Sequence, residues 1–351
     1  MKAELELRRR WIEEGKQVGV ATVARVSGSA PRPIGSRFLM SSAGDMAGSV
    51  SGGCVENDVF VRLQKVLQDG DPELVGYGIA DDEAFAVGLA CGGRIQVFLE
   101  DQTQSEVLDA VEGLIERDGL GTLAVVVGGP NLGASAVLEE GDVRVGALPP
   151  ALVDDVLADA AVLAERQESL TLEYGSDEIY LETVAPPARL VIFGAVHIGQ
   201  ELAQLAHQLG YHVTVSDARP AFLNAERFPT ADRLLPGWPD QVDVDFDRNT
   251  VVVVLSHDAR FEDPLWPRLL ASPIPYIGAM GSSGTAAKRR QRLLDEGFSS
   301  EDIERIHGPI GLGIGAETPA EVAVAIMAEV ISVRRSPRPV LRGTARRLPG
   351  V

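Results

Sequence analysis

A strand, a glycine-bounded turn, a helix and a second strand follow one another from residue 190 to residue 217. Residues 190–193 are an apolar strand, apolar positions then recur at helical spacing up to Leu209, and the next strand ends at Asp217. Two further apolar strands, at 251–255 and 276–277, are each followed by a helical pattern. Because strands that alternate with helices form parallel sheets, this part of the chain predicts an α/β fold with a doubly wound parallel sheet.

The turn in this unit has the sequence Gly-Ala-Val-His-Ile-Gly at 194–199. It follows a strand and opens a helix, as a dinucleotide-binding fingerprint requires, and Asp217 is suitably placed for a ribose hydroxyl. The middle glycine is replaced by Val196, so a β-branched side chain stands where the backbone must approach a pyrophosphate. We therefore expect a Rossmann-like unit that binds NAD(P) weakly or not at all.

Other polar loops follow the remaining strands of the same region, at 256–258, 278–283 and 307–311. In an open α/β sheet, ligands bind beyond the carboxyl ends of the strands. His257 is a candidate proton carrier, and Ser282 and Ser283 with the helix amides are candidates for holding a phosphate. The alternatives are that the serines are helix caps and that His257 is a packed polar side chain.

One of the two cysteines lies in the stretch Ser-Gly-Gly-Cys-Val-Glu at 51–56, where an apolar, glycine-rich run turns into a helical pattern. At a helix N-terminus, unpaired N–H groups and the positive end of the macrodipole favour anions. They also lower the pKa of a thiol below its free value of about 8.5. Cys54 is therefore a candidate ligand or nucleophile beside an anion-binding loop.

The second cysteine opens the sequence Cys91-Gly92-Gly93, which leads into a strand. If the two loops converge, Cys54 and Cys91 could bind a soft metal or a sulfur-bearing anionic cofactor. No histidine precedes residue 197 to complete a tetrahedral set, which counts against a metal alone. The alternative is that both are small, buried, apolar thiols.

Composition narrows the class of protein. The chain has 351 residues, of which 45% are hydrophobic, and it contains neither a run of about 18 apolar residues nor a secretory signal. We expect a cytoplasmic protein with reduced thiols and no membrane span. The net charge of -19 argues against binding to nucleic acid or anionic membranes.

The sequence predicts three segments, divided by proline and by charge. A Pro-Pro pair at 186–187 separates an N-terminal mixed α/β domain at 1–184 from a Rossmann-like domain at 188–334. A capping box with proline at the first helical position starts the last helix at Thr318. Residues 335–351 form an Arg/Pro-rich tail, either solvated or docked on an acidic partner.

These motifs, taken in order, resemble the XdhC/CoxI family. The resemblance rests on the 51–56 stretch, Cys91-Gly92-Gly93, the 194–199 turn, Ser-His-Asp at 256–258, Tyr-Ile-Gly-Ala-Met-Gly-Ser at 276–282 and His-Gly-Pro-Ile-Gly-Leu at 307–312. It implies an accessory protein for molybdenum hydroxylases such as xanthine dehydrogenase and aerobic carbon monoxide dehydrogenase. Such a protein binds molybdenum cofactor, aids its sulfuration with a cysteine desulfurase, and inserts it into the apo-enzyme.

On this basis we expect a molybdenum cofactor chaperone without catalytic residues of its own, acting as a homodimer. The residues expected to bind cofactor are Ser51, Gly52, Gly53, Cys54, Glu56, Cys91, Gly92, Gly93, Gly194, His197, Gly199, Asp217, His257, Gly281, Ser282 and Ser283, with Cys54 and Cys91 on the metal. The competing hypotheses are an NAD(P)-dependent oxidoreductase built on the second domain and a pure adaptor that holds no cofactor.

Overall fold

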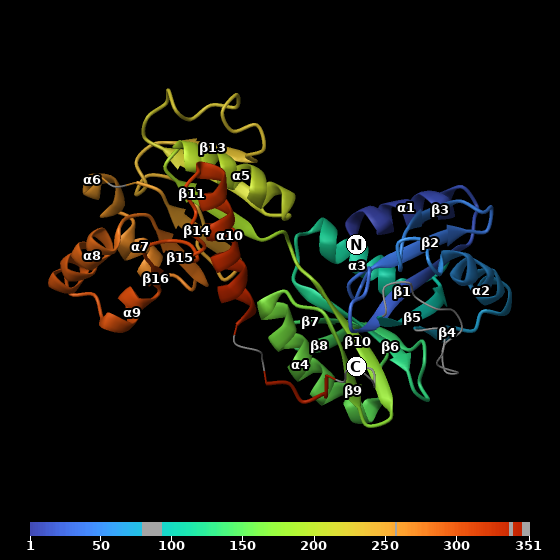
Figure 1. Cartoon of the computed structure of the whole chain (residues 1–351). Helices are drawn as coiled ribbons and strands as arrows, with labels where there is room; N and C mark the ends of the chain where they lie inside the picture. Colours follow the sequence, from blue (N-terminus) through green and yellow to red (C-terminus); the bar gives the residue numbers. More distant parts are fainter. Residues whose placement is uncertain (79–92, 257, 337–339, 346–351) are drawn as a thin grey trace. The chain divides into compact units, whose positions relative to one another are not determined.

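The computed structural model describes residues 1–78, 93–256, 258–336 and 340–345 (Figure 1). The chain forms two compact units, the first comprising Met1–Pro186 with Pro339–Val351 and the second Pro187–Arg338. The chain passes from one unit to the other inside the Pro-Pro pair. It therefore crosses between the units twice.

The first unit contains two antiparallel five-stranded sheets, with strand orders β3-β2-β1-β5-β4 and β8-β7-β6-β10-β9. The first sheet consists of β1 (Val18–Ser27), β2 (Arg37–Ser41), β3 (Met46–Gly48), β4 (Glu73–Tyr77) and β5 (Arg94–Asp101). The second sheet consists of β6 (Gly121–Gly128), β7 (Ser135–Glu139), β8 (Asp142–Gly146), β9 (Leu170–Tyr174) and β10 (Asp177–Val184). The helices are α1 (Lys2–Glu13), α2 (Glu56–Asp69), α3 (Glu106–Glu116), the short 3-10 helix η1 (Pro150–Leu152) and α4 (Val153–Arg166).

Helices cover both faces of the second sheet, as the strand β6 shows. Alternate side chains of a strand point to opposite faces. Accordingly Val125 belongs to the apolar cluster that includes α3, and its neighbour Val126 belongs to the cluster that includes α4. Burial on both faces explains why β6 is a continuous apolar run instead of an alternating pattern.

Helix α2 anchors the cysteine loop to the first sheet. Its buried residues Val59, Leu63 and Val66 recur at helical spacing and share a cluster with Ala21 and Val23 of β1. The helix ends at Gly70, which is in the left-handed conformation. The loop that precedes α2 is thus attached to a helix whose apolar stripe is fully buried.

The second unit is a parallel six-stranded sheet with strand order β13-β12-β11-β14-β15-β16. Its strands are β11 (Arg189–Phe193), β12 (His212–Asp217), β13 (Arg233–Pro236), β14 (Thr250–Val254), β15 (Tyr276–Ala279) and β16 (Ile306–His307). The order 3-2-1-4-5-6 is that of the Rossmann fold. The prediction of a doubly wound parallel sheet is confirmed.

Helices cover both faces of the parallel sheet. They are α5 (His197–Gln208), α6 (Ala259–Glu262), α7 (Trp266–Leu270), α8 (Ser283–Asp295), α9 (Ser300–Glu304) and α10 (Pro319–Arg335). Residues of α5 and α10 pack with one face of the sheet, and residues of α7 and α8 pack with the other. The capping box predicted for α10 is present, with Thr318 Oγ1 accepting from Glu321 N at 3.3 Å.

Four of the described strands, β7, β8, β13 and β16, have no counterpart in the sequence prediction. Strands β7 and β8 form a hairpin that follows β6, and β13 pairs with β12. Both β8 and β13 lie at the edges of their sheets and are largely exposed. Because edge strands bury few side chains, they lack the apolar signal by which strands are recognised.

Residues 340–345, which belong to the Arg/Pro-rich segment at 335–351, pack on the first unit. The backbone N–H groups of Arg342 and Gly343 each donate to Asp159 at 2.7 Å, and Thr344 forms an antiparallel bridge with Glu173 of β9. Leu341 packs against the apolar cluster of α4 and the second sheet.

In the part of the chain that the structure describes, no helix has the length and apolar character needed to cross a membrane.

Candidate functional site

The loop before α2 is organised around the carboxylate of Glu56, the first residue of that helix. Oε1 of Glu56 accepts hydrogen bonds from Ser49 Oγ at 2.6 Å, Val50 N at 3.2 Å and Ser51 N at 2.9 Å. Oε2 accepts from Ser51 Oγ at 2.5 Å, Gly53 N at 2.9 Å and Val55 N at 3.2 Å. The loop therefore surrounds an anion with four backbone amides and two serine hydroxyls. The anion in it is the chain's own side chain.

The two remaining amides of the loop also have internal acceptors. Gly52 N donates to Ser49 Oγ at 2.7 Å, and Cys54 N donates to Ser51 Oγ at 2.9 Å. Every backbone N–H from residue 50 to residue 55 thus has an acceptor within 49–56. We expected these amides to bind a ligand anion, but none of the six is left without a partner.

The two glycines make this conformation possible. Gly52 and Gly53 have φ angles of +76° and +113°, which side chains with a Cβ rarely adopt. Val50 and Val55, on either side of them, are buried. The loop therefore turns its backbone N–H groups inward while its ends stay fixed in the core.

Cys54 lies at the tip of this loop and is exposed, with a free thiol. Helix α2 begins two residues later, at Glu56. The amides that were expected to favour an anionic sulfur are committed to Glu56 and Ser51. What the loop offers to a ligand is an accessible sulfur atom on a rigid support.

The electrostatics of Glu56 follow from its hydrogen bonds. Partial burial acts to raise the pKa of Glu56, but the hydroxyls of Ser49 and Ser51 and the N–H of Ser51 outweigh it and lower the pKa to about 2. The side chain is therefore a carboxylate at neutral pH. Its negative charge is a permanent part of the cysteine loop.

The second cysteine loop is only partly described. Cys91 and Gly92 lie outside the described residues, so the prediction that the two cysteine loops meet stays a prediction. Gly93 lies against the loop after β1, where a Cβ would stand 2.3 Å from Ser29 O. Among the described residues, no group of three or more His, Cys, Asp or Glu side chains could hold a metal ion.

In the second unit, the Gly194 turn joins β11 to α5. The backbone N–H of Ala195 in this turn already has an acceptor within the chain. Ala195 N donates to Asp217 Oδ2 at 2.7 Å, and Arg219 donates to both carboxylate oxygens, at 2.9 Å and 2.8 Å. Asp217 is only 2% exposed. Its carboxylate, expected to meet a ribose hydroxyl, is instead held by the turn and by Arg219.

The rest of the turn keeps the backbone features of a Rossmann fold. Gly194 has a φ of +119°, and a Cβ on Gly199 would stand 2.9 Å from Gly194 O, so both positions require glycine. Val196 is the N-cap residue of α5, and its side chain accepts no hydrogen bond from the helix. The side chain of His197 is 69% exposed and lies 3.6 Å from Glu201.

The loops predicted to form a ligand site follow neighbouring parallel strands. Val254, at the end of β14, pairs with Phe193 of β11 on one side and with Ala279 of β15 on the other. The Gly194 turn and the Gly281 loop therefore leave the same edge of the sheet, two strands apart. His257, from the loop between them, lies outside the described residues.

Ser282 is the N-cap of α8, which agrees with the hypothesis that this serine caps a helix. Its Oγ accepts from Thr285 N at 3.2 Å and lies 3.1 Å from Thr285 Oγ1. Ser283 is the first residue of the helix. Gly281 has a φ of +145°, and a Cβ there would meet the Thr285 side chain at 2.8 Å. The Ser282 hydroxyl therefore accepts a hydrogen bond from the first turn of α8.

Three charged side chains of the second unit, Glu262, Arg289 and Glu329, hold these loops. Glu262 and Arg289, each 3% exposed, form an ion pair at 3.0 Å and 3.1 Å, and Arg289 also donates to Met280 O at 2.9 Å. Glu329 of α10 accepts from Tyr276 Oη at 2.6 Å and from Gly311 N at 2.9 Å. The sequence indicated Arg289 as support for a phosphate held by Ser282 and Ser283, but its guanidinium is bound to Glu262 and to Met280 O. No local pattern marks Glu262 or Glu329, because their partners are distant in sequence.

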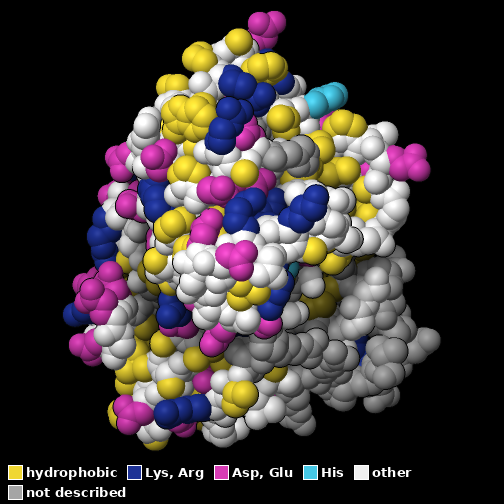
Figure 2. All heavy atoms as spheres, turned by 90° about the vertical axis from the view of Figure 1, so that its left-hand side faces the viewer, with side chains coloured by type: hydrophobic (Ala, Val, Ile, Leu, Met, Phe, Trp, Pro, Cys, Tyr) yellow, Lys and Arg dark blue, Asp and Glu magenta, His cyan; other side chains and the backbone are white. Residues whose placement is uncertain are grey.

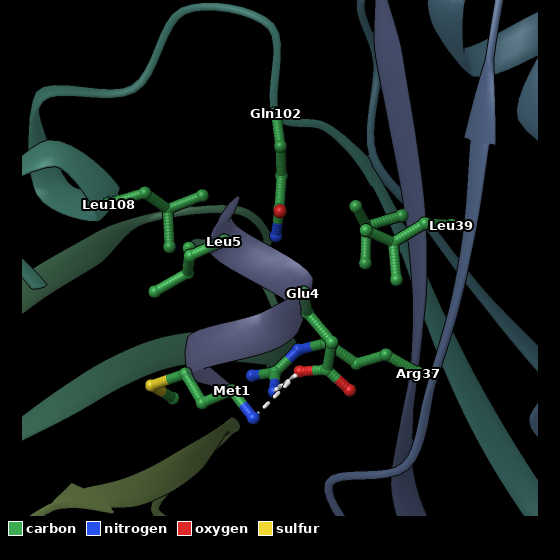
Figure 3. A pocket seen from close by; sticks show the side chains of 8 residues that line it. Met1, Glu4, Leu5, Arg37, Leu39, Gln102 and Leu108 are labelled. Carbon is green, nitrogen blue, oxygen red and sulfur yellow. Dashed lines mark hydrogen bonds and ion pairs between the residues drawn. The ribbon is translucent and has the colours of Figure 1, made fainter. Parts of the chain in front are cut away.

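Figure 3 shows a small cavity of the first unit, between α1 and the first sheet. It is lined by Met1, Glu4, Leu5, Val20, Arg37, Leu39, Gln102 and Leu108. Glu4 lies 3.1 Å from both the N-terminal amine and the Arg37 guanidinium. The cavity has space for about one water molecule and lies outside the 49–56 loop. It is too small for a pterin.

The fold and these loops define a two-unit protein, with an exposed cysteine loop on an antiparallel α/β unit and a Rossmann-type second unit. Residues 190–330 match the family described as the XdhC Rossmann domain, and residues 11–78 match the XdhC and CoxI family. The chain is 31% identical over 331 residues to a probable xanthine dehydrogenase subunit of Bacillus subtilis, covering 92% of this chain and 95% of the relative. The chain therefore belongs to the XdhC and CoxI family.

Two further comparisons agree. The chain is 27% identical to the molybdenum cofactor insertion chaperone PaoD of Escherichia coli, over 91% of this chain and 84% of that protein. A crystal structure described as a xanthine dehydrogenase from Bacillus halodurans superposes with a TM-score of 0.70, at 24% identity, over 95% of this chain and 96% of that one. The latter similarity establishes the fold alone.

Proposed function

We propose that this protein binds molybdenum cofactor in the cytoplasm and delivers it to a molybdenum hydroxylase of the xanthine dehydrogenase type. The observation that carries the proposal is the exposed thiol of Cys54 on a preformed loop. The names of two relatives, a cofactor insertion chaperone and a probable subunit of xanthine dehydrogenase, support the same role. The protein acts as a maturation factor and catalyses no reaction of its own.

The described residues fit one end of this cofactor. A cysteine sulfur is a soft donor, suited to the metal end of a molybdenum dithiolene. The terminal phosphate of the pterin needs hydrogen-bond donors, and the amides of the 49–56 loop are already committed to Glu56. Cys54 would therefore hold the metal end, and the phosphate would bind other donors.

The proposal extends to two partners. A cysteine desulfurase would supply sulfur to the bound cofactor, and the apo-hydroxylase would receive the product. A carbon monoxide dehydrogenase is a second possible acceptor of the same class. We further propose that the chaperone is a homodimer, which sedimentation velocity of the purified chain would test.

The competing function is an NAD(P)-dependent oxidoreductase, and the structure offers it little support. The carboxylate of Asp217 is engaged by Ala195 N and Arg219, and the N-cap position of α5 carries Val196 in place of a glycine. Calorimetry with NAD and NADP tests this alternative. Tight binding of either by the unmodified protein would revive it.

The test of the main proposal is retention of molybdenum cofactor. Purified chain is incubated with the cofactor and gel-filtered, and pterin fluorescence and molybdenum are measured in the protein fraction. We expect Cys54→Ser to reduce retention at least about tenfold, since it removes the soft donor. Met46→Leu is the control, because it removes another exposed sulfur, from the first residue of β3. Equal retention by the wild type and Cys54→Ser, at matched circular dichroism, would remove Cys54 from the site.

A further inference from the structure

Glu56 has six hydrogen-bond donors around one carboxylate, and none of them comes from a lysine or arginine. We propose that Glu56 is the built-in anion of the Cys54 loop, a positioning residue that holds the exposed thiol in place without binding cofactor itself. This assignment replaces the expectation that Glu56 is a cofactor ligand. It goes beyond the proposed function and does not depend on which cofactor binds.

The number of donors explains why a carboxylate is needed. Each oxygen of Glu56 accepts three hydrogen bonds, two from backbone N–H groups and one from a serine hydroxyl. A glutamine would present an NH2 group to two backbone N–H donors at one of these positions, which would leave both of them without an acceptor. The side chain of an aspartate is one methylene shorter, so its carboxylate would lie farther from these donors. The nest is therefore specific for a carboxylate at the glutamate length.

The position of Glu56 explains why it can hold the loop. It is the first residue of α2, whose residues Val59 and Leu63 are fully buried against β1. On the other side, Ser49 N donates to Arg37 O of β2 at 2.8 Å. The carboxylate thus joins the start of a buried helix to the end of a hairpin, and Cys54 lies between these two anchors.

Occupation of the nest also limits what a ligand can do there. A phosphate or carboxylate of a ligand can use these amides only after displacing Glu56, which would uncover all six donors at once. A sulfur-directed ligand meets no such barrier, because the Cys54 side chain is exposed. The geometry therefore favours recognition through sulfur over recognition through phosphate at this loop.

The test is hydrogen exchange of the free protein, measured by mass spectrometry on peptides that cover residues 50–55. Loss of the charged hydrogen bonds should speed exchange of these amides by at least about tenfold in Glu56→Ala. Sodium acetate supplies the missing CH2–COO⁻ fragment and should restore protection, whereas acetamide should not. Glu56→Gln should also exchange faster, but acetate should not rescue it, because the side chain still fills the nest.

The matched control is Glu106→Ala, which removes an exposed glutamate from the same first position of helix α3. It should leave exchange at 50–55 unchanged, and acetate should have no effect on it. Unchanged exchange in Glu56→Ala, or equal rescue by acetate and acetamide, would overturn the proposal. Since no cofactor is present, failure here is distinct from failure of Cys54→Ser to lose molybdenum.

Discussion

Glu56 and Asp217 each fill a glycine-containing turn with an internal carboxylate, in the cysteine loop and in the Gly194 turn. Each carboxylate accepts from backbone N–H groups that sequence motifs assign to a ligand anion: Glu56 in the cysteine loop and Asp217 at the Gly194 turn. A buried donor without an acceptor costs about 1–3 kcal/mol, so an internal carboxylate stabilises a turn that has no ligand. Anion-binding geometry alone therefore does not identify an anion-binding site.

At the residue scale, the stability contributed by Asp217 should depend on pH. Burial acts to raise its pKa, but hydrogen bonds from Arg219 and Ala195 N outweigh it and hold the pKa below the ordinary value. The contribution is therefore present above the unfolded-state pKa of about 3.9 and is lost as the pH falls through the lower folded-state value. Asp217→Asn should lower the free energy of unfolding by about 1–3 kcal/mol at pH 7, and the difference should shrink below about pH 4.

Urea denaturation at a series of pH values measures this difference. Asp240→Asn, an exposed position in the same unit, is the control and should show almost no difference at any pH. A wild-type advantage over Asp217→Asn that stayed constant down to pH 3 would mean that ionised Asp217 does not stabilise the turn.

At the scale of elements, the hairpin of β2 and β3 determines where the cysteine loop begins. Gly48 ends β3 with a φ of +74°, and the next residue donates from its backbone to Arg37 O. A Cβ on Gly48 would stand 2.2 Å from that same oxygen. The loop can start here only because this residue has no side chain.

Gly48→Ala should therefore destabilise the protein more than left-handed strain alone predicts. Gly44 in the same hairpin is the matched control, since its φ is +91° and a Cβ there meets nothing within 4 Å. Gly44→Ala should cost about 1–2 kcal/mol, the ordinary cost of a left-handed alanine. Gly48→Ala should cost clearly more in urea denaturation, because Arg37 O must also move. Equal costs for the two variants would contradict the close approach.

At the scale of the whole molecule, the C-terminal segment makes the first unit discontinuous in sequence. The chain leaves the second unit after α10, and residues 340–345 dock on α4 and β9 of the first. The Asp159 carboxylate accepts a hydrogen bond from Tyr174 Oη at 2.8 Å and two more from backbone N–H groups of the segment. On the face in Figure 2, basic side chains lie among acidic ones.

Docking of the C-terminal segment should appear as coupling between Asp159 and residues 340–345. Asp159→Asn in the full chain should lower the free energy of unfolding by about 2 kcal/mol, since it weakens hydrogen bonds to a charged acceptor. In a chain that ends at residue 338, the same substitution should cost less, because two of the three donors are gone. A double-mutant cycle by urea denaturation gives the coupling, and equal costs in both chains would mean that the segment does not bind Asp159 in solution.

The sequence by itself determined the parallel sheet, the start of α10 and the glycine-rich form of the cysteine loop. These features arise from local periodicity, helix capping and backbone conformation, so each strand, helix start and turn is indicated by residues adjacent in sequence. Edge strands such as β8 escaped prediction, because little of their surface is buried. Family membership was also predictable, because the motifs keep their order along the chain.

Only the tertiary structure decided what occupies the anion-binding turns and where the C-terminal segment lies. Asp217 reaches Ala195 across 22 positions, and Asp159 reaches Gly343 across 184. Glu56 is close in sequence to its loop, yet the six residues 51–56 do not reveal whether its side chain turns inward or toward a ligand. A carboxylate is drawn to whichever donors the folded chain leaves unpaired, and those donors exist only once helices and strands have packed.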